Sequence, residues 1–306
     1  MSLSVPPNVI FWSFVRSVTV ATGTQWHKVS YYLWTHSGNV DAAAPQRTIV
    51  CWHGLARNAH DFDVLAQHLV KHIPNARVVA VDTPGRGKSD NLTNAGAYHL
   101  QTYAVAFMAI YNALGAPESI EWVGVSMGGL LGMLLCAASD KCPIKKLVLI
   151  DVGPFIPAAS VARIGTYVGK DPKFENMAEA EKYFKTIYGQ MGADITEEQW
   201  KWMTRFLTKA TGDGENLQLH YDPAISTAFI GNDPKDMDVW VLWDLVKTPV
   251  MVYHGLVSDL LTADVLEQMG NRGPKIHKIV PFPDVGHTPH LYHQKNCQAI
   301  LDWFSQ

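Results

Sequence analysis

The sequence predicts an α/β fold with a mostly parallel central sheet and helices on both faces. Short, nearly continuous apolar runs alternate with segments of helical spacing from about residue 47 to 153, and the alternation returns after residue 248. Apolar runs of this kind are typical of strands buried on both faces of a parallel sheet. The chain has 306 residues, 47% of them hydrophobic, which is enough for one large core.

The first predicted elements are three strands, followed by a helix and a further strand. Two strands at 15–22 and 27–34 are rich in β-branched and aromatic residues, with a turn containing Gly23 between them. The run RTIVCWHG (47–54) then predicts the first buried strand. A helix at 59–72 follows from apolar residues at helical spacing, namely Phe62, Leu65, Ala66, Leu69 and Ile73. The run at 76–85 predicts the next buried strand.

The later elements continue the same alternation. Helical spacing predicts helices at 99–114, 130–139, near 262–270 and near 289–303. Apolar runs predict strands at 119–126, 145–153, 248–255 and 275–282. Strand–helix–strand units of this kind imply right-handed crossovers between parallel strands.

The alternation stops between residues 155 and 245. This segment is polar-aromatic and helix-like, with four tryptophans. We expect a core domain of residues 1–154 and 246–306 and a helical cap insertion of residues 155–245. An insertion at the C-terminal end of a strand would lie above the sheet edge where open α/β sheets bind ligands. The alternative is that the segment only extends the core.

Composition excludes several classes of partner. Lys and Arg number 25 and Asp and Glu 28, a formal net charge of −3, which argues against a nucleic-acid or polybasic membrane surface. The four cysteines have no metal-type spacing and suit a reducing compartment. The N-terminal apolar patch is too short to span a membrane. We therefore expect a cytoplasmic protein that binds neither nucleic acid nor membranes.

The stretch GVSMG (124–128) places a serine where a buried strand meets a small-residue helix. Its glycines could simply permit a tight turn. They also permit the strained corner that exposes a nucleophilic hydroxyl at the N-terminus of a helix. The buried strand before and the helix after favour the second interpretation, so Ser126 is the expected nucleophile.

A serine nucleophile requires a histidine base, which a carboxylate orients. His287 in DVGHTPHLY (284–292) is the expected base, because this loop follows the last predicted strand. His290 and His293 are competitors, but they fall inside the predicted final helix. Asp259 is the expected acid, in the loop after the strand at 248–255. Asp151, at the end of LVLIDVG (147–153), is the alternative.

The loop after the first buried strand is expected to complete the site. His53 and Gly54 would form a tight turn that presents the Leu55 N–H, which together with the Met127 N–H could stabilise an oxyanion. His53 itself is expected to make local structural hydrogen bonds. Arg57 is expected to be a solvated loop arginine, with binding of a substrate carboxylate as the alternative. The glycine-rich stretch 82–90 lacks phosphate-loop spacing and is expected to be a structural turn.

These motifs together resemble the α/β-hydrolase superfamily, and in particular its bacterial serine esterases. The matching pieces are HG (53–54), DTPGRGKS (82–89), GVSMGG (124–129), SD (258–259) and GH (286–287), in the family's order. The resemblance implies an eight-stranded sheet with a helical cap, a triad of Ser126, Asp259 and His287, and no metal or cofactor. Arg86 departs from the histidine that members of the superfamily often carry. Related dehalogenases and epoxide hydrolases have an aspartate nucleophile, against which Ser126 argues.

The sequence thus predicts a serine hydrolase that cleaves a small-molecule carboxylic ester or related acyl substrate. A C–C bond hydrolase or a lactonase would share the triad, and a pocket cation such as Arg57, Arg163 or Arg205 would favour them. An acyltransferase would need a dry site. A ligand receptor on the same fold, with little turnover, is the alternative from another class.

Overall fold

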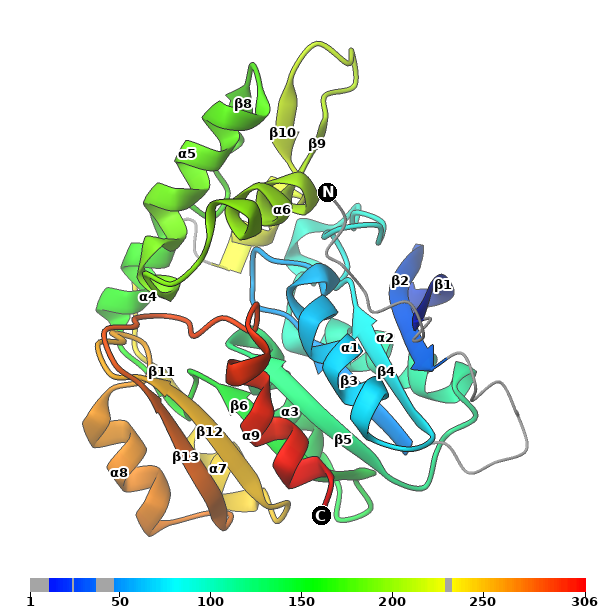
Figure 1. The fold of residues 1–306 in the computed structure, drawn as a ribbon, viewed down its shortest axis with the longest axis vertical. Coiled ribbons are helices and arrows are strands. Elements are labelled where there is room, and N and C mark those ends of the chain that lie inside the picture. Colours follow the sequence, from blue (N-terminus) through cyan, green and yellow to red (C-terminus); the bar gives the residue numbers. More distant parts are fainter. Residues whose placement is uncertain (1–10, 24, 37–46, 229–232) are drawn as a thin grey trace.

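The computed structural model describes residues 11–23, 25–36, 47–228 and 233–306, so the first ten residues of the predicted core domain lie outside the described part. Eight strands form one central sheet (Figure 1). In their order across the sheet they are β1 (Phe11–Thr22), β2 (Gln25–His36), β4 (Ala76–Val81), β3 (Arg47–Trp52), β5 (Ile120–Val125), β6 (Ile144–Ile150), β12 (Val250–Gly255) and β13 (Ile276–Phe282).

The sheet is mostly parallel, as predicted. β1 pairs antiparallel with β2, and β2 pairs antiparallel with β4. All pairs from β4 to β13 are parallel. Because the parallel strands run the same way, the loops that follow β3, β5, β6, β12 and β13 meet at one edge of the sheet.

Helices cover both faces of the sheet. The helices of the sheet domain are α1 (Asp63–His72), α2 (Leu100–Ala113), α3 (Met127–Ala138), α7 (Trp240–Leu245), α8 (Ala263–Asn271) and α9 (Gln294–Phe304), and short 3₁₀ turns lie at η1 (Ala59–Phe62) and η2 (Ala95–Ala97). Helices α1 and α9 pack together in front of the sheet in Figure 1, and α2 packs with α3 behind it. The final helix begins at Gln294, later than predicted, so His290 and His293 lie in the preceding loop.

Two apolar clusters result, one on each face. Ile49 and Cys51 of β3 belong to the cluster under α1 and α9, whereas Val50 and Trp52 belong to the cluster under α2 and α3. Successive side chains of a strand point to opposite faces. Both faces are covered by helices, which is why this strand reads as a continuous apolar run instead of an alternating one.

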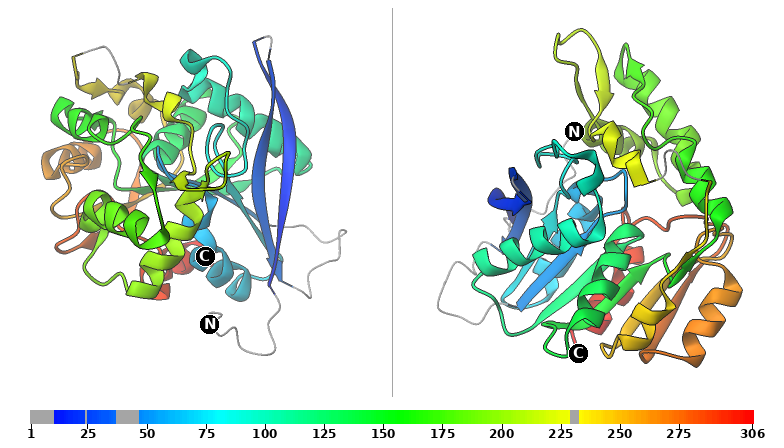
Figure 2. Two further views of the ribbon diagram at one scale, coloured as in Figure 1. Left: turned by 90° about the horizontal axis from the view of Figure 1, so that it is seen from above. Right: turned by 180° about the vertical axis from the view of Figure 1, so that it is seen from behind.

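Most of the chain between β6 and β12 forms a separate layer (Figures 1 and 2). This layer lies at the edge of the sheet where the loops after the parallel strands meet. It contains α4 (Ala158–Gly165), α5 (Met177–Tyr188), η3 (Gly189–Met191), α6 (Glu197–Leu207), η4 (Pro223–Ala228) and a small sheet of β8 (Lys173–Phe174), β9 (Thr208–Ala210) and β10 (Leu217–Leu219). We call residues 158–228 the cap segment. A capping box between Thr196 and Gln199 fixes the start of α6.

The end of the predicted insertion lies with the core. Strands β7 (Phe155–Ile156) and β11 (Met237–Asp238) pair, which brings the entry and the exit of the cap segment together. After this pair, α7 packs against α3, and Trp243 of α7 is fully buried. We therefore place the end of the cap before β11, earlier than the predicted limit of residue 245.

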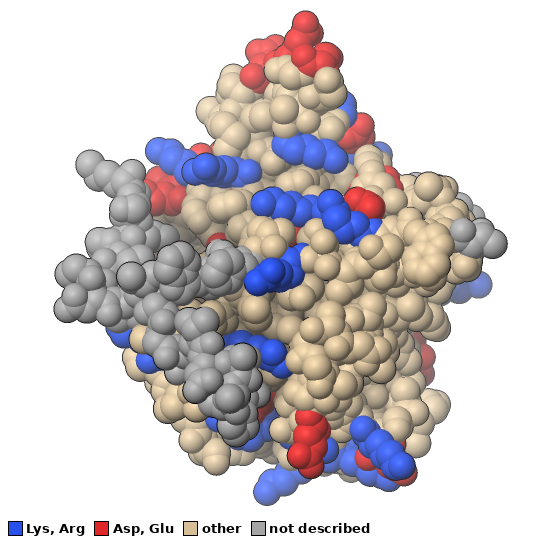
Figure 3. Space-filling model, turned by 90° about the vertical axis from the view of Figure 1, so that its right-hand side faces the viewer, with Lys and Arg blue, Asp and Glu red and all other residues tan. Residues whose placement is uncertain are grey.

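The surface in Figure 3 carries both basic and acidic side chains, separated by broad uncharged areas. Within the described ranges, no helix is long and apolar enough to cross a membrane.

Candidate active site

Ser126 occupies the sharp corner between β5 and α3. Its backbone lies in the left-handed region, with φ of 50°, which is strained for a side chain other than glycine. The glycines two residues before and two residues after Ser126 are required by close packing. A Cβ on Gly124 would lie 2.3 Å from the carbonyl oxygen of Gly128, and a Cβ on Gly128 would lie 2.0 Å from that of Trp52.

His287, in the loop after β13, contacts Ser126. The distance from its Nε2 to the Ser126 Oγ is 3.0 Å, and its Nδ1 lies 2.8 Å from Oδ2 of Asp151. With the proton on Nδ1, the imidazole donates to the carboxylate and accepts from the serine hydroxyl. This is the hydrogen-bond series that activates a serine nucleophile.

Asp151 directly follows β6 and is completely buried. Its φ of 51° turns the side chain towards the loops that follow the parallel strands. The Gly255 N–H donates to Oδ1 at 3.0 Å, and the Ser258 hydroxyl donates to Oδ2 at 2.6 Å. Burial acts to raise the pKa of this carboxyl, but the imidazoles of His254 and His287 outweigh it and hold the pKa below its usual value.

Asp259 lies in the loop after β12, as predicted, but the prediction that it orients His287 is wrong, because Asp151 makes that contact. Both of its carboxylate oxygens accept from Arg163 of α4, at 2.6 and 2.7 Å. The turn after β12 explains this placement. Ser258 takes the inward position and donates to Asp151, and the next residue along the chain points outward to the cap segment.

The expected oxyanion donors, the backbone N–H groups of Leu55 and Met127, lie in segments next to Ser126. A Cβ on Gly54 would lie 3.7 Å from the Ser126 Cβ, so the loop after β3 passes next to Ser126. Leu55 lines the pocket in front of Ser126. Met127 is the first residue of α3, and the first N–H groups of a helix have no acceptor within it.

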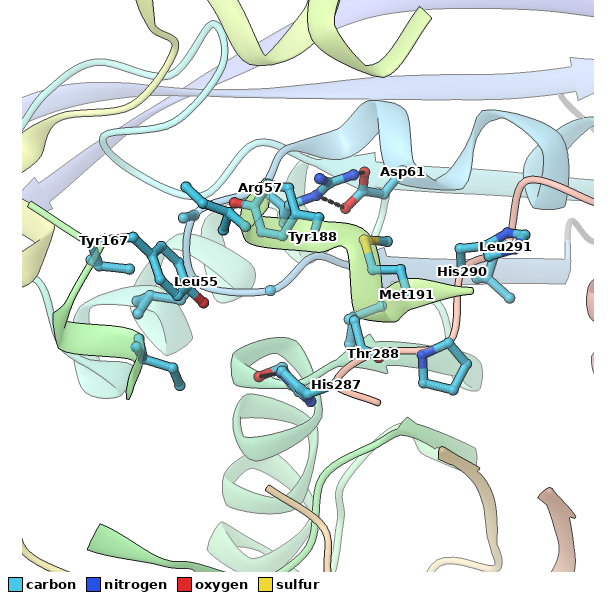
Figure 4. A pocket seen from close by; sticks show the side chains of 18 of the residues that line it. Leu55, Arg57, Asp61, Tyr167, Tyr188, Met191, His287, Thr288, His290 and Leu291 are labelled. Carbon is cyan, nitrogen blue, oxygen red and sulfur yellow. Dashed lines mark hydrogen bonds and ion pairs between the residues drawn. The ribbon is translucent and has the colours of Figure 1, made fainter. Parts of the chain in front are cut away.

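A pocket lies between the sheet edge and the cap segment (Figure 4). Ser126 and His287 line it from the core. The cap segment contributes an apolar and aromatic wall of Ile164, Tyr167, Val168, Ile187, Tyr188 and Met191. An apolar pocket in front of a serine that is hydrogen-bonded to a histidine is suited to an acyl substrate.

Comparison with known proteins agrees with this fold. Residues 47–294 match the family model described as alpha/beta hydrolase fold. The chain belongs to the α/β-hydrolase family. It is 36% identical over 270 residues to a 3-hydroxybutyrate-oligomer hydrolase of Cupriavidus necator, covering 86% of this chain and 88% of that protein.

Solved structures also resemble this α/β hydrolase along nearly its whole length. A putative hydrolase from Rickettsia typhi superposes with a TM-score of 0.83 at 30% identity, covering 96% of this chain and 99% of that one. An alpha/beta hydrolase from Novosphingobium aromaticivorans gives 0.79 at 29% identity, covering 95% and 98%.

His53 of this hydrolase is structural, as expected. Its Nδ1 donates to the Gly54 carbonyl at 2.6 Å, and its Nε2 accepts from the Thr83 N–H at 3.0 Å. Arg86 has a role that the sequence did not reveal. It is buried, and its Nε donates to the Leu55 carbonyl at 2.9 Å while Nη1 donates to Pro84 and to Tyr103. This side chain therefore fixes the Leu55–Ala56 peptide, which directly follows the peptide that carries the expected oxyanion donor.

Arg57 is buried in the pocket wall, so the expectation of a solvated loop arginine is wrong. It pairs with Asp61, and its Nη2 also donates to the Tyr292 hydroxyl. Burial opposes the charge of Arg57, but Asp61 holds its pKa above the usual value. Arg163 also lines the pocket, paired with Asp259, whereas Arg205 is exposed on α6 and is not among the lining residues.

His290 and His293 serve a different contact. Nε2 of His290 lies 2.8 Å from Oδ1 of Asp194, and Nε2 of His293 lies 3.0 Å from the carbonyl oxygen of that residue. The Tyr292 N–H donates to Nδ1 of His290, which leaves the proton of the neutral ring on Nε2. Both histidines therefore tie the loop of His287 to the cap segment.

Proposed function

We propose that this α/β hydrolase cleaves carboxylic esters through an acyl-enzyme on Ser126. The observation that carries the proposal is the continuous hydrogen-bond series from Ser126 through His287 to Asp151. Asp151 takes the role that the sequence assigned to Asp259.

The reaction proceeds in two halves. His287 removes the Ser126 proton as the oxygen attacks the ester carbonyl, and it then protonates the leaving alcohol. Water, deprotonated by the same imidazole, attacks the acyl-enzyme, and the imidazolium returns the proton to the Ser126 oxygen as the acid is released. Asp151 holds the imidazole with its proton on Nδ1 and stabilises the imidazolium that forms in each half.

The Leu55 and Met127 N–H groups stabilise the negative oxygen of the tetrahedral intermediate. Gly54 passes beside Ser126, and Met127 begins a helix whose N-terminus carries partial positive charge. Donors of this type contribute roughly 3–4 kcal/mol each to the transition state.

The substrate we propose is a short oligoester of a 3-hydroxy acid. The support is the relative named for hydrolysing 3-hydroxybutyrate oligomers, which matches 86% of this chain. The mostly apolar wall suits the methyl and methylene groups of such an oligomer.

Intact-protein mass after treatment with a fluorophosphonate tests the nucleophile. We expect one adduct on the wild type and none on Ser126→Ala. An equal adduct on the variant, or no adduct on the folded wild type, would overturn the mechanism.

A separate assay tests the substrate. Wild type and Ser126→Ala are incubated with the 3-hydroxybutyrate dimer and trimer and with ethyl butyrate, and the released acids are quantified. We expect the wild type to cleave all three. Cleavage of ethyl butyrate alone would retain ester hydrolysis and reject the oligomer as substrate.

A further inference from the structure

A polar cluster interrupts the apolar wall of the pocket. It consists of Arg57, Asp61 and Tyr292, all of which line the pocket. The guanidinium and the carboxylate are joined twice, including a 2.9 Å bond from Nε to Oδ2, and the Tyr292 hydroxyl donates to Oδ1 at 3.0 Å. The side chains of Arg57 and Asp61 are only 8% and 15% exposed. An ion pair buried at this depth carries a desolvation cost, so its place in a substrate pocket requires an explanation.

The cluster has hydrogen-bonding capacity left over. Among the described residues, the acceptor found for Nη1 of Arg57 is the thioether sulfur of Met203, at 3.0 Å. A thioether is a weak acceptor, and Nη1 carries two protons. Oδ2 of Asp61 accepts from Nε of Arg57, which leaves lone pairs available on this oxygen. The carboxylate is held by Nε and Nη2, so Nη1 lies on the far side of the guanidinium, facing Met203. The spare acceptor, Oδ2, belongs to Asp61, which lines the pocket.

The charge of the cluster selects the kind of group that can bind there. Arg57 and Asp61 together carry no net charge, because each neutralises the other. A substrate carboxylate would be repelled by Asp61 at close range. A hydroxyl group is neutral and is a hydrogen-bond donor, so it can donate to Oδ2 of Asp61 while Arg57 balances the charge of that carboxylate.

The position of the cluster relates it to the acyl group of the substrate. In Figure 4, Arg57 and Asp61 lie together on one side of the pocket and His287 lies on the opposite side. The leaving alcohol must be next to His287, which protonates it. The acyl chain therefore extends away from His287, towards Arg57 and Asp61.

We propose that Arg57 and Asp61 form a hydroxyl-binding subsite for the acyl chain. This proposal rests on the proposed ester hydrolysis and adds to it the substrate class: the acyl group that is transferred to Ser126 carries a hydroxyl. On an oligomer of a 3-hydroxy acid, the free hydroxyl end then occupies the subsite. The enzyme releases monomers from that end.

A purely structural role for the same residues makes a different prediction. Arg57 also joins the core to the cap segment, since its guanidinium lies 4.7 Å from the centre of the Tyr188 ring and contacts Met203. If this were its only role, substitution would slow hydrolysis of every ester by the same factor.

The first test compares p-nitrophenyl 3-hydroxybutyrate with p-nitrophenyl butyrate as substrates of the wild-type protein. Hydrogen bonds to charged groups predict a kcat/KM about 10- to 100-fold higher for the hydroxylated ester. The 3-methoxy analogue cannot donate to Asp61, and its kcat/KM should fall to the level of the butyrate ester or below. This arm uses the native protein, so it does not depend on the folding of a variant.

The second test removes the subsite with the double variant Arg57→Met, Asp61→Asn. Replacing both partners avoids leaving one buried charge unpaired. The substitutions can slow hydrolysis of both esters by a common factor. In the double variant, the ratio of kcat/KM for the hydroxylated ester to kcat/KM for the butyrate ester should nevertheless fall to about one. The matched control is Arg163→Gln with Asp259→Asn, which removes the other ion pair at the pocket and should preserve the ratio.

The outcomes separate the two proposals. Hydrolysis of neither ester by the wild type would reject the proposed function itself. Hydrolysis of both esters at equal kcat/KM would leave the function standing and reject the subsite. An unchanged preference in the Arg57→Met, Asp61→Asn variant would also reject the subsite.

Discussion

Asp151 at the end of β6 lies with its Oδ2 2.8 Å from Nδ1 of His287, although 136 residues separate them in the chain. β6 is flanked in the sheet by β12 and by β5, which Ser126 directly follows. The end of β6 is therefore held between Ser126 and the loop of Ser258. The carboxylate is oriented by the Gly255 N–H and the Ser258 hydroxyl before any substrate arrives.

This relationship predicts different effects for the two candidate acids. Asp151→Asn should lower kcat by about 10³- to 10⁴-fold, because the amide no longer holds the proton on Nδ1 of His287. Asp259→Asn removes only a partly exposed ion pair with Arg163 and should change kcat less than about tenfold. Steady-state kinetics on one ester measures both. A larger loss from Asp259→Asn would restore the assignment made from sequence.

Arg86 provides a second prediction as a positioning residue. Arg86→Lys breaks the bond to the Leu55 carbonyl, so the neighbouring N–H shifts away from the oxyanion position. We expect kcat to fall by about 10- to 100-fold with little change in KM. The measurement is made well below the unfolding temperature of the variant, so that lost stability does not enter kcat.

Arg77 offers a matched control for that experiment. It also anchors backbone, donating to the Leu114 carbonyl at 2.8 Å, but it lies at the start of β4, away from the loop edge of the sheet. Arg77→Lys should lower the unfolding temperature and leave kcat nearly unchanged. Equal losses of kcat in the two variants would show that Arg86 acts only through global stability.

The sequence predicted the sheet and the corner at Ser126 because both depend on local patterns. Buried parallel strands are recognisable by apolar runs, and the turn is recognisable by its glycines. The choice between Asp151 and Asp259 depended instead on turn geometry, since both residues follow a parallel strand. Nothing local indicates that Ser258 occupies the inward position after β12.

The burial of Arg57 could not be predicted from the sequence either, because its contacts come from distant parts of the chain. Its partners include Met203, 146 residues away on α6, and Tyr292, 235 residues away beyond the last strand. The loop that carries Arg57 resembles any polar loop after a strand. Only the packing of the cap segment on the core turns it into part of a pocket wall.

His53 predicts a pH dependence of stability. Burial lowers its pKa to about 3, whereas an unfolded histidine titrates near 6.5. Unfolding below pH 6.5 therefore takes up a proton at this residue. Its contribution to stability is complete above pH 6.5 and is lost as the pH falls from there towards 3. At pH 5 the loss amounts to about 2 kcal/mol.

Urea unfolding of the wild type and of His53→Gln at pH 7 and pH 5 measures this effect. The variant should be less stable at pH 7, because it loses the bond from the Thr83 N–H. Between pH 7 and pH 5, however, the wild type should lose about 2 kcal/mol more than the variant. Other buried histidines titrate in both proteins and cancel in this difference. Parallel pH profiles would show that His53 is not held neutral.

The close packing at Gly128 predicts that the corner at Ser126 does not accept a larger residue at this position. In Gly128→Ala the new Cβ would lie 2.0 Å from the Trp52 carbonyl oxygen, so α3 and β3 must move apart. Overpacking of this kind costs about 1–3 kcal/mol, and the movement also displaces Ser126 from His287. The control is Gly165→Ala at the end of α4, where a Cβ meets no atom within 4 Å and stability should rise by at most about 1 kcal/mol. Urea unfolding and kcat measure both variants. Full activity and stability in Gly128→Ala would mean that this glycine is not needed to bring α3 against β3.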